Sequence, residues 1–375
     1  MSSERPEVES LSICPTSKSG VHVASRIRGS LYGVAIGDAL GGPVEFRARG
    51  SFKSVTGYRY NHNFNLKPGT WTDDTSMTLC LAQSLVENEG KFLIPDQIKK
   101  YMNWMEHGYM SATGVCFDIG NATRHALTVW KESMRSTTDA NAMEIEHIQR
   151  IIDRTLNREV IVSVVDNKLQ VFCGNGSLMR CTPVPLVYHG SHDLAQQYAA
   201  KASSLTHPHP TCQQACQIYT HLLVEIIENS SLESKTDLWE CLQRFDATEG
   251  GGFGTAGNLT PALRDALGRY RGLEDLRQTP DHEIKSSGYV VHTLEAAQWA
   301  FFTTETFQEG ALKVVNLGND ADTVGAVYGG LAGAWYGQDA LPVEWLDGLQ
   351  AKPMIDQVVE GVTKLVANGA YDGGP

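Results

Sequence analysis

The spacing of hydrophobic and polar residues along this chain predicts mainly α-helices. Apolar residues recur three and four positions apart, as at Ile27, Leu31 and Val34, which is the period of one helix face. Helices are predicted over 24–39, 74–88, 95–107, 121–133, 140–156, 192–204, 211–229, 235–245, 260–270, 291–302, 305–316, 323–336 and 353–367. The apolar runs 159–165 and 169–172, on either side of a polar Asp-Asn-Lys, instead predict a small β-hairpin. We therefore expect an all-α fold with one small β-hairpin insertion.

Glycines form a second pattern, at intervals of four residues, inside two of these predicted helices. The first set is Gly29, Gly33, Gly37 and Gly41, and the second is Gly325, Gly329 and Gly333. Residues four apart share one helix face, and each glycine costs a helix about 1 kcal/mol relative to alanine. A close approach between backbones would compensate for that cost. We expect both helices to be central and closely packed, and they are candidates for packing on each other.

Composition narrows the class of protein. Of 375 residues, 42% are hydrophobic and 20% are charged, which is ordinary for a globular protein. A net charge of −12 argues against nucleic-acid and membrane-surface partners. We see no signal segment, no membrane span, and eight scattered cysteines without a CxxC pair, so we expect reduced thiols and a cytoplasmic or nuclear location. Residues 1–22 are predicted to be a disordered tail, 23–370 a single domain, and the protein a monomer.

Two similar Thr/Asp clusters stand at predicted helix starts. One contains Thr72, Asp73 and Asp74, and the other contains Asp320, Asp322 and Thr323. Such residues commonly cap helices. If the two clusters and Glu45 converge, however, their carboxylates require protons or cations between them, and hydroxyl and carboxylate oxygens suit Mg²⁺, Mn²⁺ or Ca²⁺. Capping and a metal site are about equally supported by spacing alone.

Three further segments carry candidate chemistry, each with a plain structural alternative. The loop Gly174-Asn175-Gly176 can present backbone N–H groups to an anion, or it can be an ordinary turn. Asp118 can bind a guanidinium or cap the helix that follows. A zinc site could be drawn from one group of His and Cys residues, but their spacing fits no standard zinc pattern. That group is His207, His209, Cys212, Cys216 and His221.

Seven motifs in order resemble the ADP-ribosylglycohydrolase family. They are GDALGGPVEF, WTDDT, FDIGNATRHAL, GNGSLMR, LTHPHP, SSGYVVHTLEAAQWAF and NLGNDADTVGAVYGGLAGAWYG, and they run from about 27 to 337. Each motif alone is weak, but their shared order is highly specific. The resemblance implies an orthogonal multi-helix fold, a site for two Mg²⁺ or Mn²⁺ ions, and hydrolysis at C1″ of ADP-ribose in an ADP-ribosylated substrate.

The same resemblance implies roles for individual residues. Catalysis is expected to involve Glu45, Asp74 and Asp322. The expected metal ligands are Thr72, Asp73, Asp74, Asp320, Asp322 and Thr323, with Asp322 between the ions. The expected ligand-binding residues are Asp118, Asn121, Gly174, Asn175, Gly176, Ser177, Met179 and His207.

The chain departs from the family pattern at two places. Asn319 stands where the family usually has glycine, and the segment from about 128 to 172 is an unusually long insertion.

Asp118 favours ADP-ribosyl-arginine as substrate. The alternatives are ADP-ribosyl-serine, O-acetyl-ADP-ribose, ADP-ribose-1″-phosphate, or an unrelated nucleoside or sugar phosphate. A non-enzymatic ADP-ribose-binding or crystallin-like protein is a further alternative.

Overall fold

The computed structural model describes residues 21–135, 145–152, 173–245 and 259–369, and their regular secondary structure is almost entirely helical. The α-helices are α1 (Val23–Gly41), α2 (Asp73–Glu87), α3 (Ile94–His107), α4 (Asn121–Arg135), α5 (Ile145–Ile151), α8 (Pro183–Tyr188), α9 (His192–Ser204), α10 (Pro210–Glu228), α11 (Lys235–Arg244), α12 (Pro261–Gly268), α13 (Leu273–Gln278), α14 (Val290–Phe302), α15 (Phe307–Val315), α16 (Ala321–Tyr336), α17 (Val343–Gly348) and α18 (Lys352–Ala367). Short 3₁₀ turns are η1 (Gly42–Val44), η3 (Asp281–Glu283) and η4 (Gln338–Ala340). The predicted all-α class is confirmed, while the predicted hairpin and most of the predicted tail lie outside the described residues.

The two glycine-bearing helices, α1 and α16, pack directly on each other, as the glycine spacing suggested. A Cβ added to Gly33 would lie well inside van der Waals distance of the Gly329 carbonyl oxygen, and Gly37 stands in the same way against Gly325. The Ser30 hydroxyl also donates to the Gly330 carbonyl oxygen, at 2.7 Å. Any side chain on these faces would hold the two backbones apart, so glycine is required there by close approach.

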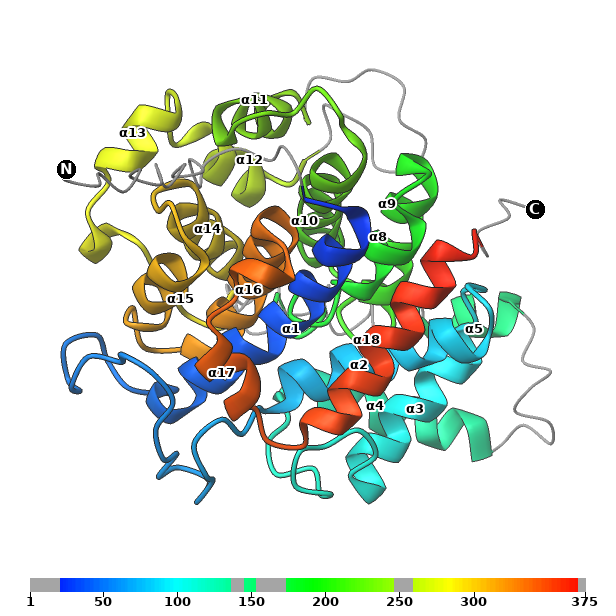
Figure 1. Ribbon diagram of the computed structural model, residues 1–375. Helices are drawn as coiled ribbons and strands as arrows, with labels where there is room; N and C mark the ends of the chain where they lie inside the picture. Colours follow the sequence, from blue (N-terminus) through cyan, green and yellow to red (C-terminus); the bar gives the residue numbers. More distant parts are fainter. Residues whose placement is uncertain (1–20, 136–144, 153–172, 246–258, 370–375) are drawn as a thin grey trace, which may run out of the picture.

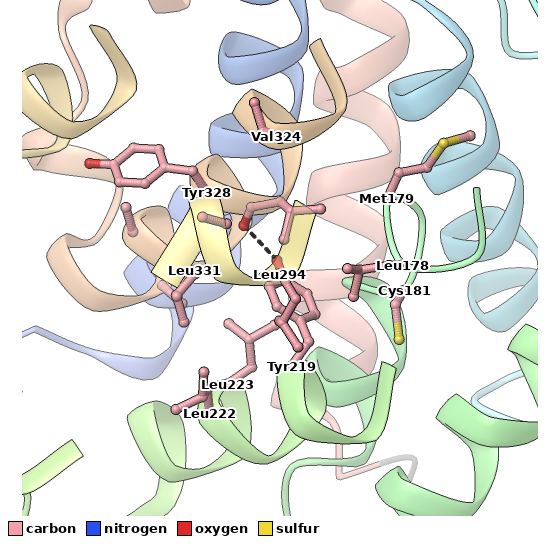
Figure 2. Close-up of a cluster of buried hydrophobic side chains, with 14 of the residues drawn as sticks. Leu178, Met179, Cys181, Tyr219, Leu222, Leu223, Leu294, Val324, Tyr328 and Leu331 are labelled. Carbon is pink, nitrogen blue, oxygen red and sulfur yellow. Dashed lines mark hydrogen bonds between the residues drawn. The ribbon is translucent and has the colours of Figure 1, made fainter. Parts of the chain in front are cut away.

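The remaining helices surround this pair. In Figure 1, α1 (blue) and α16 (orange) lie side by side in the middle, with α2 and α18 on one side and α14 and α15 on the other. Figure 2 shows part of the core, where Tyr219 and Leu223 of α10 meet Leu294 of α14 and Leu331 of α16. The outer helices therefore hold the central pair in place through apolar packing.

The close pairing also fixes where polar helix ends meet. The end of α1 at Gly41 lies against Ala321, the first residue of α16, and Asp38 near the end of α1 contacts Thr72 at the start of α2. The N-termini of α2 and α16 and the C-terminal part of α1 thus converge. Since a helix N-terminus favours negative charge, this is a suitable place for acidic side chains.

A smaller apolar cluster lies on the α5 side of the molecule. Ile148 and Ile151 of α5 pack with Trp130 of α4 and Ile98 of α3. The predicted helix over 140–156 is described only as α5 and the residue after it. Three helices of six residues, α8, α13 and α17, were not predicted, because so short a segment has no readable period; α8 also contains two prolines.

Two further expectations concern the described residues. All seven cysteines in these ranges are free thiols, as expected. None of the helices in the described ranges is long and apolar enough to cross a membrane.

Candidate active site

Asp38 joins the end of α1 to the start of α2. Its carboxylate accepts hydrogen bonds from the backbone N–H and hydroxyl of Thr72, at 2.9 Å each, and from the backbone N–H of Thr75, at 3.0 Å. The Thr75 hydroxyl donates to the same group at 2.5 Å. Burial raises the pKa of Asp38 to about 6, against the lowering effect of these hydrogen bonds. Asp38 therefore supplies the cap that no side chain of α2 itself provides.

Thr72 brings three carboxylates together. Its hydroxyl oxygen lies 2.9 Å from Asp38 Oδ1, 3.2 Å from Asp74 Oδ2 and 3.5 Å from Asp322 Oδ2. A hydroxyl has one proton, and the nearest acceptor is Asp38. The approaches to Asp74 and Asp322 therefore leave oxygens facing oxygens. Burial, followed by the repulsion between these two groups, raises the pKa of Asp74 well above its ordinary value.

A second acidic group adjoins the first. Oxygens of Glu45, Asp320 and Asp322 lie within 4.8 Å of one another, and so do oxygens of Asp38, Asp74 and Asp322, so Asp322 belongs to both groups. Asp320 accepts a hydrogen bond of 2.5 Å from the Asn175 side chain. Burial, then repulsion from Asp322 and Asp118, raises the pKa of Glu45.

These residues fit a divalent cation. Glu45 Oε2 and Asp74 Oδ1 are buried and have no hydrogen-bond partner among the described residues, which is costly for carboxylate oxygens unless a proton or a cation reaches them. The donor set consists of carboxylates and threonine hydroxyls, the hard oxygen ligands preferred by Mg²⁺ and Mn²⁺. The acidic groups could therefore hold metal ions.

An open cavity of about 650 Å³ connects this acidic region to a glycine loop. At the loop, Gly174 pairs with Tyr289 in an isolated antiparallel bridge, and the Asn175 N–H donates to the Gly288 carbonyl oxygen at 3.1 Å. A Cβ on Gly176 would lie 2.9 Å from the His207 ring and 3.0 Å from the Thr123 hydroxyl. Glycine is needed at 176 because His207 and α4 crowd the loop.

A buried chain of hydrogen bonds orients His207. Arg180 donates to the Thr206 hydroxyl oxygen at 2.7 Å, and this oxygen lies 2.8 Å from His207 Nδ1. Since the Thr206 hydroxyl oxygen already accepts from Arg180, we assign the hydroxyl as the donor to Nδ1. Nδ1 is then an acceptor without a hydrogen, so the imidazole carries its hydrogen on Nε2. Burial, with Arg180 nearby, lowers the pKa of His207 to about 3, so the ring is neutral.

The structure brings most of the predicted site residues to this one cavity. Its lining includes Glu45, Asp73, Asp74, Asp118, Asn121, Gly174, Asn175, Gly176, Met179, His207, Asp320, Asp322 and Thr323. Thr72 and Ser177 do not line it. Thr72 is buried beneath the carboxylates, and the Ser177 hydroxyl turns inward to accept a hydrogen bond of 2.8 Å from Ser203.

Several residues at the site escaped the sequence reasoning. Phe46 lines the cavity with its side chain 69% exposed, and Thr123 and Gly288 line it as well. Phe46 follows Glu45 directly, so its place beside a candidate catalytic residue was the available signal. The sequence reasoning noted Asp38 only as an acidic residue. Its capping contacts are with Thr72 and Thr75, which lie 34 and 37 residues further along the chain, so sequence spacing could not reveal them.

Asn319 has a backbone conformation that glycine also adopts readily. Its φ of +57° is in the left-handed region, which asparagine tolerates better than most residues. Its carbonyl oxygen accepts from the Phe46 N–H at 2.6 Å, and its own N–H donates to the Arg47 carbonyl oxygen at 2.7 Å. The side chain adds a 3.2 Å hydrogen bond to Ser286. Asn319 therefore ties the start of α16 to the loop that carries Glu45.

The residues of the zinc alternative serve separate purposes. His209 Nδ1 accepts from the Thr211 N–H at the start of α10, and the Cys212 thiol points at the Gly174 carbonyl oxygen, at 3.5 Å. His207 faces the glycine loop. Within the described residues, no three of these five side chains form a group of metal ligands with one another, and His221 lies instead beside His192 and Glu225.

Comparison with known proteins agrees with this geometry. A family model described as ADP-ribosylglycohydrolase matches residues 19–371. The ADP-ribosylarginine hydrolase Tri1 of Serratia proteamaculans is 32% identical, over 89% of this chain and 78% of its own. The ADP-ribosyl-[dinitrogen reductase] glycohydrolase of Rhodospirillum rubrum is 28% identical, over 89% and 93%.

A solved structure is similar over a comparable length. It is titled ADP-ribosylglycohydrolase-related protein complex, and its TM-score to this chain is 0.66 at 32% identity, over 92% of this chain and 99% of the other. Family match, relatives and fold agree over nearly the whole length. The chain therefore belongs to the ADP-ribosylglycohydrolase family and is an enzyme of that class.

Proposed function

We propose that this enzyme releases ADP-ribose from modified arginine side chains, with divalent cations held by its acidic groups. The observation that carries the proposal is the single cavity that joins buried, unpartnered carboxylate oxygens to a glycine loop beside a neutral histidine. One end suits cations and a ribose, and the other suits a diphosphate. The name of the Serratia relative supports arginine as the acceptor.

Six residues are proposed to hold two Mg²⁺ or Mn²⁺ ions. They are Thr72, Asp73, Asp74, Asp320, Asp322 and Thr323. Bound ions of this kind supply Lewis-acid charge and lower the pKa of a water molecule. The position of Asp322 in both acidic groups supports a role between two ions. Asp38, which is saturated with hydrogen bonds, is proposed to fix Thr72 and not to act as a ligand itself.

Glu45 is proposed to move the proton during hydrolysis. In the reaction, the bond from C1″ to a guanidinium nitrogen breaks, a water oxygen bonds to C1″, and a water proton passes to the leaving nitrogen. The products are ADP-ribose and unmodified arginine. Glu45 Oε2 is buried and has no partner within the described ranges, so this carboxyl can exchange a proton with water or substrate. Asp74 and Asp322 would hold the cation that lowers the pKa of the attacking water.

The other end of the cavity is proposed to bind the diphosphate and nucleoside. The backbone N–H groups near Gly174 and Gly176, with the Nε2 hydrogen of His207, can donate to phosphate oxygens. Asn121 begins α4 at the cavity wall, and Met179 offers an apolar surface. Ser177 is proposed to support the loop from below, because its hydroxyl bonds with Ser203.

Asp118 is proposed to recognise the acceptor. Its carboxyl lines the cavity, and burial raises its pKa, while Arg124 and the Ile119 N–H favour its charged form. A guanidinium leaving group would gain a charge-assisted hydrogen bond there. We further propose that residues 23–370 form one catalytic domain; most of the insertion at about 128–172 lies outside the described residues.

The test is a panel of four C1″ derivatives offered with Mg²⁺, Mn²⁺ or EDTA and followed by mass spectrometry. They are ADP-ribosyl-arginine peptide, ADP-ribosyl-serine peptide, O-acetyl-ADP-ribose and ADP-ribose-1″-phosphate. We expect the arginine peptide to be cleaved fastest, and only with metal. Asp322→Asn should lower kcat by about 10³-fold or more while the fold is retained. The substitution removes a negative charge from the site, and losses of this size follow when an enzyme loses a group that stabilises charge in the transition state. Turnover that survives both EDTA and this substitution would exclude the metal mechanism, and preference for another derivative would exclude arginine.

A further inference from the structure

We infer that the chain has a second metal site, for Zn²⁺ or a similar transition-metal ion, between α9, α10 and α11. Its ligands are His192, His221 and Glu225. One donor atom from each side chain lies within 4.8 Å of the others, and His192 Nε2 is 3.1 Å from Glu225 Oε1. Two imidazoles and one carboxylate are a donor set that binds zinc in proteins.

Helix geometry holds the three side chains together. His221 and Glu225 are four residues apart on α10, so they lie one above the other on one face. His192 is the first residue of α9, which packs along α10 (Figure 1, green helices). The ring centroids of His192 and His221 are 5.5 Å apart. A small movement of side chains alone could therefore bring three donors around one ion.

Solvent can reach the three side chains, so an ion can enter the site and water can serve as a fourth ligand. The His192 side chain is 41% exposed and that of Glu225 is 15% exposed, so the site is open to solvent. Cys241 of α11 hydrogen-bonds Glu225, and its backbone carbonyl oxygen lies 3.3 Å from His221 Nε2. Water can complete a tetrahedral set.

The chemistry of this group differs from that of the acidic cavity. The cavity offers carboxylate and hydroxyl oxygens, whereas the α9–α10 group offers imidazole nitrogen beside one carboxylate. Hard ions such as Mg²⁺ prefer oxygen ligands, and Zn²⁺ binds nitrogen and sulfur well. The two sites should therefore hold different ions in the same molecule.

A neighbouring His–Glu pair provides a matched comparison. His189, just before α9, hydrogen-bonds Glu228, the last residue of α10. This pair has no third ligand within reach in the described residues. An ordinary His–Glu ion pair and a metal site can therefore be compared side by side on one helix surface.

The experiment titrates the full, chelator-treated protein with Zn²⁺ by calorimetry, in excess Mg²⁺ so that the acidic cavity is filled. We expect one tightly bound Zn²⁺ per chain, a higher Tm when it is present, and a tetrahedral visible spectrum when Co²⁺ replaces it. His192→Ala and His221→Ala should each weaken binding by more than the roughly 10–100-fold that loss of a supporting residue costs. His189→Ala should bind normally.

Because His221 is partly buried, the solvent-exposed His192 is the decisive position. The His192→Ala protein should fold, keep its hydrolase activity with Mg²⁺, and lose the zinc-dependent gain in Tm. Two results overturn the inference: absence of zinc binding in excess Mg²⁺, or zinc affinity that both histidine substitutions leave unchanged. Neither result depends on which substrate the cavity hydrolyses.

Discussion

At the residue scale, the buried carboxylates differ in how many of their oxygens have partners. Asp38 accepts from both Thr72 and Thr75, so its role is to anchor α2. Asp74 Oδ1 and Glu45 Oε2 accept no hydrogen bond in the part of the chain that the structure describes, so they are the oxygens available to a ligand. Carboxylates of the same chemistry thus differ in role: one saturated with hydrogen bonds supports the fold, and those with a free oxygen can bind a ligand.

The orientation of His207 leads to a prediction at this scale. Thr206→Val removes the hydroxyl between Arg180 and His207, leaving Nδ1 without its donor and the imidazole free to change tautomer. A lost buried hydrogen bond costs about 1–3 kcal/mol, so affinity for ADP-ribose should fall roughly 5–150-fold. Calorimetry with ADP-ribose measures this, and KM should rise more than kcat falls.

Thr206→Ser is the matched control, because it keeps the hydroxyl and removes only a methyl group. It should bind ADP-ribose nearly as well as the original protein. If Thr206→Val binds equally well at an unchanged Tm, the chain from Arg180 to His207 has no part in orienting the imidazole.

At the element scale, the central prediction concerns the contact between α1 and α16. Gly33→Ala would place a methyl group against the Gly329 carbonyl, and backbone cannot rotate away as a side chain can. The helices must separate, which should cost about 3 kcal/mol or more in the free energy of unfolding. Turnover should fall too, because Asp38 and Asp322 sit at the ends of these helices. Urea unfolding measures the first effect.

Gly268→Ala in α12 is the control for helix propensity. A Cβ there meets nothing within 4 Å, so alanine should leave stability unchanged or raise it by up to about 1 kcal/mol. Similar losses at 33 and 268 would mean that close packing is not the reason for glycine in α1.

The sequence predicted elements better than contacts between elements. Helical period located α1, α2, α10 and α16, and glycine spacing pointed to the packing of α1 on α16, because both signals are local. The cap from Asp38 to Thr72 and the chain from Arg180 to His207 join separate elements, so no spacing records them. Ser177 was expected at the ligand for its place in a glycine motif, yet its hydroxyl turns toward Ser203 of α9.

At the scale of the whole molecule, the acidic residues that give the net charge of −12 do not all ionise equally easily. Burial and mutual repulsion raise the pKa of Asp73, Asp74 and Asp322 well above ordinary values, and burial raises that of Asp38 to about 6. In the unfolded chain, carboxyls lose their protons near pH 4. Between pH 4 and these higher values the folded protein therefore binds more protons, so its stability falls as pH rises.

This sign gives a prediction for pH and metal together. Without divalent ions, Tm should fall by several degrees between pH 5.5 and pH 8, since the folded protein must either keep protons that the unfolded chain has already released or ionise carboxyls that are buried. Mg²⁺ replaces those protons, so it should raise Tm more at pH 8 than at pH 5.5. Asp322→Asn, which removes the carboxylate common to both acidic groups, should flatten the pH dependence and shrink the gain from Mg²⁺. Scanning calorimetry at both pH values checks this, and an equal Mg²⁺ effect at the two would mean that cations and protons do not compete for these oxygens.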